Sequence, residues 1–400
     1  MKILHHPAHW LKITLLGICL GILLVTPPVA EQQNRPRGDT HPAVTASPDV
    51  TALRRVHIHR ATYDYPALIA DLQAIASRQS PLLLSQISTS SIADLYREIA
   101  LLLAATNPNA APEYLTHAIK LDPALRATLR PLQRAIYLHS NTDPAYLLTT
   151  SGRELAALGE WHLAEAAFQN AISANPSYAE AWAYLGEARQ HSNSNADPYT
   201  ALETALKLNP ESVAAHSFLS FYWQRQNDLE TALEYARNAA TLAPGTPELL
   251  MRLGDLTALS GDLAAGQEIY LQAIAANPDN PDSLRALIAF NLRYGFDLRN
   301  AALPLARQLV IASPRSPESL DLMGEVLLRL GDLANAERFF FRSLEQDPNF
   351  AQAHLHLGDL YWLQGEIQPA AAHYRRALAL SHNEAVILRI KTALDEMGVP

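Results

Sequence analysis

The sequence predicts an all-α protein in which similar helix pairs are stacked into a solenoid. Two features of its C-terminal two-thirds predict this fold: prolines that recur with one period, and small residues that recur with the same period. A period near 34 residues is typical of arrays that copy and stack one unit of two helices. The prolines are separated by 34, 34, 34, 36 and 34 residues: Pro176, Pro210, Pro244, Pro278, Pro314 and Pro348.

When each proline is counted as the thirty-second residue of its unit, residues 145–383 divide into seven consecutive units, the first of which begins at Ala145. Position eight is then small in six units, and position twenty-four is bulky in several. We expect the small residues to let the two helix backbones cross closely while bulky side chains interdigitate with them. The small residues are Gly152, Gly186, Ser220, Gly254, Gly324 and Gly358, and the bulky ones are Phe168, Tyr270, Phe340 and Tyr374.

The turn inside each unit has its own signal. Position fifteen is glycine or asparagine in every unit, the residues that best tolerate a left-handed helix end. A polar or acidic residue follows in six units, where its side chain could accept a hydrogen bond from the free amide groups at the start of the second helix. The turn residues are Gly159, Asn193, Asn227, Gly261, Gly295, Gly331 and Gly365, and the cap residues are Glu160, Ser194, Asp228, Asp262, Asp332 and Glu366.

These positions resemble the tetratricopeptide repeat, a 34-residue helix pair with Leu-Gly in its first helix and recurring alanine, aromatic and proline positions after it. The segment Trp182-Ala-Tyr-Leu-Gly186 matches especially well. The resemblance covers residues 145–383 and implies a right-handed α-α superhelix whose first helices line a concave groove. The departures are Ile288 at position eight of the fifth unit, two extra residues after Gly295, and Pro198 in place of alanine in the second unit.

Helices are also predicted on both sides of the seven units. Residues 51–143 are expected to form a helical N-terminal segment with a helix at 66–78, one degenerate repeat at about 92–123, and a single helix from Leu125 to Leu138. Pro131 would lie near the start of that single helix, where proline is tolerated. Residues 384–400 are expected to form a capping helix and tail that cover the apolar end of the array.

The first thirty residues predict a signal peptide or a signal anchor. Lys2 and Lys12 precede an apolar run from Ile13 to Val25. The run is about 13 residues long, nearer to a secretory core than to the roughly 20 residues of a spanning helix, whereas the small-x-small cleavage pattern is poor. Cleavage and retention therefore both stay open, and either places the repeats outside the cytoplasmic membrane. Residues 31–50 are polar and proline-rich and predict a flexible linker.

The composition and the absence of known motifs argue against several classes of function. The net charge of −9 gives no basic footprint for nucleic acid. No metalloprotease, nucleophile-elbow, phosphate-loop or dinucleotide-binding motif is present, so the sequence predicts no enzyme activity, no cofactor and no metal site. Cys19 is the only cysteine, which excludes a disulfide within the chain.

Function is therefore expected at the groove that the resemblance implies. Its candidate residues are mostly acidic with interspersed aromatic rings, and no unit has the Lys and Asn pair by which some family members bind the C-terminal carboxylates of chaperones. Such a groove suits basic or amphipathic peptides, although a solvated, weakly selective face would have the same composition. The candidates are Tyr146, Glu187, Phe221, Asp255, Glu325, Asp359 and Trp362.

The sequence thus predicts a non-enzymatic scaffold or adaptor that binds peptide segments of other proteins on the outer side of the cytoplasmic membrane. The alternative is an accessory subunit of an envelope enzyme system for cell wall, secretion or polysaccharide assembly, in which the array holds a glycan or a substrate chain. An enzyme with its site in residues 51–143 is disfavoured, because that segment is short, helical and without a recognisable catalytic group.

Overall fold

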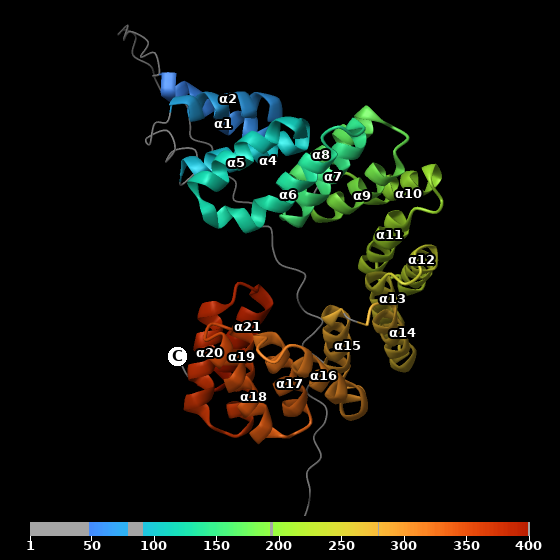
Figure 1. Ribbon diagram of the computed structural model, residues 1–400, viewed down its shortest axis with the longest axis vertical. Coiled ribbons are helices and arrows are strands. Elements are labelled where there is room, and N and C mark those ends of the chain that lie inside the picture. The colour runs from blue at the N-terminus through green and yellow to red at the C-terminus, as the bar shows by residue number, and fades with distance from the viewer. Residues whose placement is uncertain (1–47, 79–90, 193–194, 279, 399–400) are drawn as a thin grey trace, which may run out of the picture. The chain divides into compact units, whose positions relative to one another are not determined.

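The computed structural model describes residues 48–78, 91–192, 195–278 and 280–398, and these residues form helices and turns without a strand. The predicted leader at 1–30 and most of the linker at 31–50 lie outside the described residues. A helix begins at Pro48, within the last three residues of the predicted linker. The helices before the array are α1 (Pro48–Ala61), α2 (Tyr65–Arg78), α4 (Ile92–Thr106), α5 (Ala111–Leu121) and α6 (Arg126–His139) (Figure 1).

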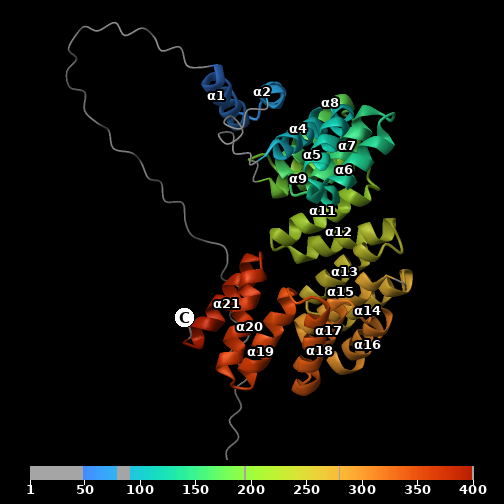
Figure 2. The same ribbon diagram turned by 60° about the vertical axis from the view of Figure 1, so that its left-hand side comes forward.

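Seven helix pairs follow. The two helices of a pair pack on each other, and the second helix also packs on the first helix of the pair that follows (Figure 2). The predicted all-α solenoid of tetratricopeptide-type pairs is confirmed. The pairs are α7 (Pro144–Ala157) with α8 (Trp161–Ala174), α9 (Ala179–His191) with α10 (Pro198–Leu208), α11 (Val213–Arg225) with α12 (Leu229–Leu242), α13 (Pro247–Leu259) with α14 (Leu263–Ala276), α15 (Pro281–Tyr294) with α16 (Leu303–Ala312), α17 (Pro317–Arg329) with α18 (Leu333–Gln346), and α19 (Ala351–Leu363) with α20 (Ile367–Leu380).

The helices of a pair cross where position eight meets position twenty-four. A Cβ added to Gly358 would lie 2.6 Å from the ring of Tyr374, and one added to Gly324 would lie 2.5 Å from the ring of Phe340. Real Cβ atoms do not approach carbon this closely, so glycine is what admits the ring.

In two pairs the side chains at the crossing differ in size from this glycine and ring. The third pair has Ser220 opposite Ala236, and the fifth has Ile288 at position eight with Ala306 at the equivalent of position twenty-four. All four residues are buried. Ile288, a departure from the repeat pattern, is therefore matched by a small residue on the second helix, which keeps the filled volume similar.

The predicted turns are confirmed wherever they are described. The residues at position fifteen have a positive φ, from 60° at Asn227 to 106° at Gly261. Whether a cap residue makes its hydrogen bond depends on the length of its side chain. Asp228, Asp262 and Asp332 accept a hydrogen bond from a backbone amide in the first turn of the second helix, whereas Glu160 and Glu366 accept none there.

The two extra residues of the fifth unit are absorbed after Gly295. Asp297 takes a positive φ of 46°, and a π-helical turn, Leu298–Ala302, leads directly into α16. Such a wider turn takes up added residues without displacing the helix that follows.

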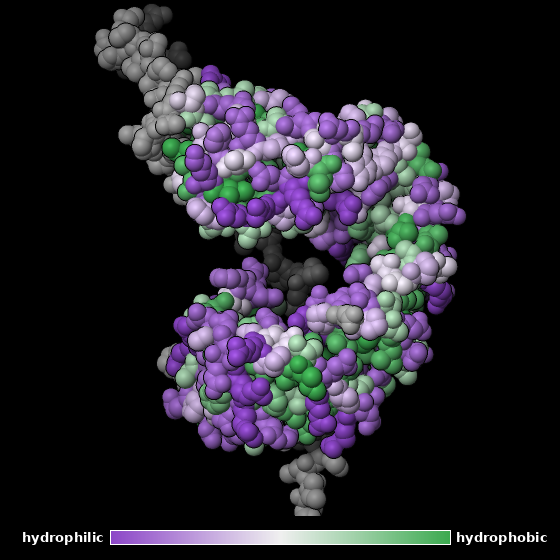
Figure 3. Space-filling view, viewed as in Figure 1, coloured by the Kyte–Doolittle hydropathy of each residue, from purple (hydrophilic) through white to green (hydrophobic). Residues whose placement is uncertain are grey.

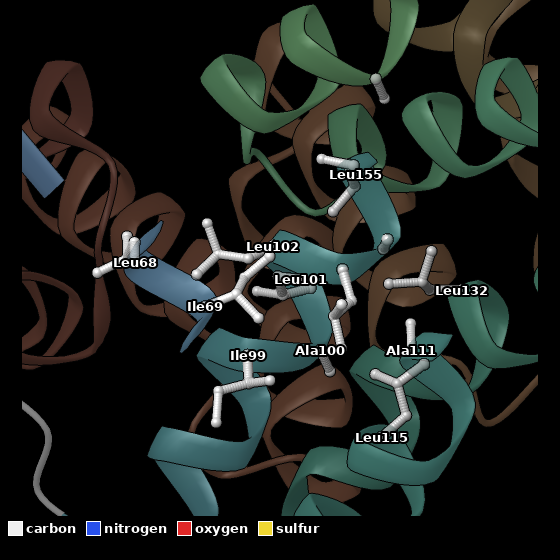
Figure 4. Packing of buried hydrophobic residues seen from close by; sticks show 14 of the residues in the cluster. Leu68, Ile69, Ile99, Ala100, Leu101, Leu102, Ala111, Leu115, Leu132 and Leu155 are labelled. Carbon is white, nitrogen blue, oxygen red and sulfur yellow. The ribbon is translucent and has the colours of Figure 1, made fainter. Parts of the chain in front are cut away.

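The N-terminal helices share one apolar core with the first repeats. Figure 4 shows side chains from α2, α4, α5, α6 and α7 meeting there, among them Leu115, Leu132 and Leu155. At the other end of the chain α21 (Glu384–Glu396) buries Ile390 and Leu394 against α20. The apolar faces of the terminal pairs are thus both covered.

Candidate interaction surface

The predicted groove residues lie on the first helices of six pairs. Five of them occupy position nine, so the repeat geometry places them in register on α9, α11, α13, α17 and α19. We call this set, with Tyr146 and Trp362, the first-helix row. Hydrophilic and hydrophobic residues alternate over the visible face of the array (Figure 3). The members of the row are Tyr146 on α7, Glu187 on α9, Phe221 on α11, Asp255 on α13, Glu325 on α17, and Asp359 and Trp362 on α19.

Two aspartates of the row hold a tyrosine of their own pair and an arginine farther along the chain. Asp255 accepts hydrogen bonds from the Tyr270 hydroxyl at 3.0 Å and from Arg293 at 3.3 Å. Asp359 accepts one from the Tyr374 hydroxyl at 2.7 Å and one from Arg389. Burial and the adjacent carboxylate raise the pKa of both tyrosines, which therefore stay protonated donors.

Glu325 belongs to a cluster around a buried histidine. The Nδ1 of His356 lies 2.9 Å from Asp321, and its Nε2 lies 3.8 Å from Glu325. Burial alone would lower the pKa of His356, but the charges of Asp321, Glu325 and Asp359 and the hydrogen bond to Asp321 raise it to about 9. Glu325 and Asp359 thus both lie near enough to this imidazole to favour its charged form.

Glu187 lies in a network that joins the second and third pairs. It accepts hydrogen bonds from Gln190 at 2.9 Å and from His191 at 3.1 Å. Arg225, one repeat later, donates to Gln190 and lies 3.3 Å from His191. The carboxylate is therefore already hydrogen-bonded within the chain.

Phe221 is covered in part by a cation. The guanidinium of Arg252 lies 3.8 Å from the centre of the Phe221 ring and donates to the carbonyl of Ser220 at 2.9 Å. Burial lowers the pKa of Arg252 to about 10. The other two aromatic rings of the row pack edge-on: Tyr146 against His139, and Trp362 against Tyr374.

Every carboxylate of the row is thus paired inside the chain. Sequence reasoning identified the acidic residues but missed their partners, among them Arg293, His356 and Arg389. One signal was available: aspartate occupies position nine only in the two units that have tyrosine at position twenty-four. A tyrosine hydroxyl buried at the crossing needs an acceptor there.

A groove lies between α6 and α7. It has a volume of about 860 Å³ and is lined by Arg126, Arg130 and Arg134 on α6 and by Tyr146 and Arg153 on α7, among others. Tyr146 is therefore the only predicted site residue in its lining. Pro131 stands inside α6 rather than near its start, as the sixth residue of the helix.

The recurring histidines have packing partners. His216 and His354, both at position four, donate through Nε2 to the carbonyl oxygens of Pro210 and Pro348, at 2.9 Å and 3.1 Å. The Nδ1 of His373 lies 3.1 Å from that of His354, and burial lowers the pKa of both. Among the residues that the structure describes, no three histidine, cysteine or acidic side chains are placed to hold a metal ion.

The array is matched by a family model at three places. The tetratricopeptide repeat model covers residues 149–197, 222–281 and 322–385. These three segments lie almost entirely within the seven helix pairs and are similar to the tetratricopeptide repeat family. Yeast Tom70, a solved structure, has the same fold, with a TM-score of 0.50 and 14% identity over 88% of this chain and 82% of that one.

Two curated proteins each align with about two thirds of this chain. Cellulose synthase operon protein C of Xanthomonas axonopodis pv. citri (strain 306) is 26% identical over 64% of this chain, and the peroxisomal targeting signal receptor of Eremothecium gossypii is 25% identical over 65% of it. The alignments span 18% and 46% of those proteins. In the parts of the chain that the structure describes, no helix combines the length and apolar composition needed to cross a membrane.

Proposed function

We propose that this chain is a non-enzymatic scaffold that binds amphipathic segments of other proteins along the first-helix row. The proposal rests on the contrast within that row between paired carboxylates and accessible aromatic rings. Each of its carboxylates has a partner side chain within the chain, while Tyr146 is exposed and the rings of Phe221 and Trp362 are partly exposed. Aromatic anchors surrounded by satisfied polar groups are typical of protein-binding hot spots.

The pairing of the carboxylates selects amphipathic partners over strongly basic ones. A lysine or arginine of a partner would have to displace Arg293 from Asp255 or Arg389 from Asp359. An apolar side chain laid against an exposed ring displaces only water, which is favourable. The likeness to a targeting signal receptor supports protein partners in general.

Site-specific photocrosslinking in the native host tests this proposal. A benzophenone amino acid would replace Phe221 or Trp362 in the row, and Phe341 on the second helix α18 as a control, because Phe341 is also exposed. We expect one protein to be captured from both row positions and not from Phe341. Binding of that protein, once purified, should fall about tenfold or more in Phe221→Ala and Trp362→Ala. Equal capture from all three positions would contradict the proposal.

The proposed location is the outer side of the cytoplasmic membrane, supported by the basic and apolar pattern of residues 1–30. Alkaline phosphatase fused to the C-terminus should be active, and a fluorescent protein that matures only in the cytoplasm should be dark. The opposite result would place the array inside the cell.

A second candidate is an accessory subunit of a polysaccharide assembly system, favoured by the likeness to cellulose synthase operon protein C. In that case soluble cello-oligosaccharides should bind the full chain, and Tyr146→Ala and Trp362→Ala should abolish binding because sugars stack on aromatic rings. Binding that is unchanged in both variants would exclude this candidate at the first-helix row.

A further inference from the structure

Helix α6 has two faces of opposite character. Leu129, Leu132 and Ile136 are fully buried, and Figure 4 shows Leu132 in the shared core. Arg126, Arg130 and Arg134 follow one another at four-residue spacing, are exposed, and line the α6–α7 groove. We call these three residues the arginine row.

The arginine row has no acidic partner in the described chain. Across residues 48–78, 91–192, 195–278 and 280–398, no carboxylate lies within 4.0 Å of any of the three guanidinium groups. Like charges at four-residue spacing on a helix repel one another and destabilise it. In a chain with 40 acidic and 31 basic residues, such a row is not explained by helix stability.

We infer that the α6–α7 groove binds an acidic segment of a partner protein. This inference rests on the proposed scaffold function and assigns a second, separate surface to it. Four residues of helix rise by about 6 Å, which is close to the spacing of alternate residues in an extended peptide. Glutamates or aspartates at every second position would therefore each reach one arginine, and Arg-carboxylate pairs are geometrically specific.

Apolar lining residues fit the remainder of such a segment. Ala127, Pro131, Ala135 and Leu138 lie in the groove beside the arginines, and the Tyr146 ring stands on the opposite wall. Side chains between the acidic positions of the peptide would contact this surface. The groove is thus amphipathic, as expected of a peptide site.

Two observations favour a short peptide over a long polyanion. Glu154 lies in the lining, where it would repel a continuous line of phosphates or uronates. The net charge of −9 means that a nucleic acid or anionic glycan leaving the groove would meet a negatively charged chain. A short acidic segment can place its carboxylates on the arginine row alone and end within the groove.

The test uses the full chain and a short fluorescent peptide that alternates Glu with Ala, beside its Gln counterpart. Fluorescence anisotropy would measure binding to the native chain, to Arg126→Gln/Arg130→Gln/Arg134→Gln, and to a matched control, Arg237→Gln/Arg307→Gln/Arg338→Gln. The control arginines are also exposed and lie on second helices. Both variants change the net charge equally, from −9 to −12 by loss of three positive charges.

We expect the arginine-row variant to bind the Glu peptide about tenfold or more weakly, and the control variant to bind it within about twofold of the native chain. The Gln peptide should not bind, and salt should weaken the Glu peptide. An equal loss of affinity for the Glu peptide in both variants would mean that binding depends only on the net charge of the chain, and would overturn the inference. Tighter binding of polygalacturonate or of single-stranded DNA, lost in the arginine-row variant, would overturn the peptide assignment.

These outcomes are separable from the scaffold proposal. A partner that crosslinks at Phe221 and Trp362 while the Glu peptide ignores the arginine row would leave the scaffold intact and reject this groove. Circular dichroism of each variant would establish that it is folded before its binding is compared.

Discussion

The α6–α7 groove and the first-helix row both carry charged side chains at regular spacing, yet they use charge differently. In the row, Asp255 and Asp359 each accept hydrogen bonds from a tyrosine and an arginine of the same chain. On α6, the arginines have no acidic partner in the described residues. The comparison teaches that a charge repeated along a solenoid can join one repeat to the next, and that the charges left without partners are the ones available to a ligand.

The row depends first on the close crossing of each helix pair. Gly358→Ala should destabilise the chain by about 3 kcal/mol, because the new Cβ would lie 2.6 Å from the buried ring of Tyr374 and would displace it from Asp359. Urea unfolding would measure this loss. Gly365→Ala is the control: its Cβ meets nothing, so only the positive φ of 78° should cost about 1 kcal/mol. Equal losses would mean that strain, not packing, sets the crossing.

The paired state of the row is tested next. Asp359→Ala should cost about 2 kcal/mol, because the Tyr374 hydroxyl and the Arg389 guanidinium lose their acceptor. Asp359→Asn keeps an acceptor for the tyrosine and should cost less. In a Tyr374→Phe background the loss should shrink, and a loss of undiminished size would show that the hydroxyl is not the group that needs Asp359.

The His356 cluster should make stability depend on pH. Its folded-state pKa of about 9 lies above the ordinary value of 6.5, so its stabilisation is complete below pH 6.5 and is lost as the pH rises through 9. Between pH 6.5 and 8 the native chain should lose roughly 1–2 kcal/mol relative to His356→Gln. Thermal unfolding of both proteins across this range would measure the difference. Parallel curves would mean that the imidazole is not charged in the folded state.

The smallest effect on stability is expected from the arginine row. Arg126→Gln/Arg130→Gln/Arg134→Gln should change the free energy of unfolding by less than about 0.5 kcal/mol, because no described carboxylate loses a partner. A loss above about 1 kcal/mol in urea unfolding would show that the row is structural, and the contrast with Asp359 would then fail.

The sequence predicted most of the fold because its signals are local. Turn glycines, aspartate caps and the small residues at the crossings all act within one unit, and the structure agrees at each described turn. Glu160 and Glu366 fail as side-chain caps since their side chains are one methylene longer than aspartate. Helix α1 was missed because part of its packing on α2 is polar, with Arg55 and His59 both in hydrogen-bond contact with Asp71.

The interaction surface was less predictable because its partners are distant in sequence. Arg293 lies 38 residues beyond Asp255, and Arg389 lies 30 beyond Asp359. A list of groove positions gives the acidic residues but not the cations that neutralise them. The spacing of the arginines on α6 can be read directly, whereas their lack of partners can be known only in three dimensions.

The matched sizes at the helix crossings bear on how such an array can be inherited. The ring of Phe340 requires glycine at position 324, and Ile288 is paired with the small Ala306. The two helices of a unit therefore have complementary shapes where they cross. A genetic exchange of one helix between these two pairs would join two large residues or two small ones, creating a clash or a void. Duplication or recombination is therefore tolerated in whole units, and a designer who shortens or lengthens this chain should cut between pairs.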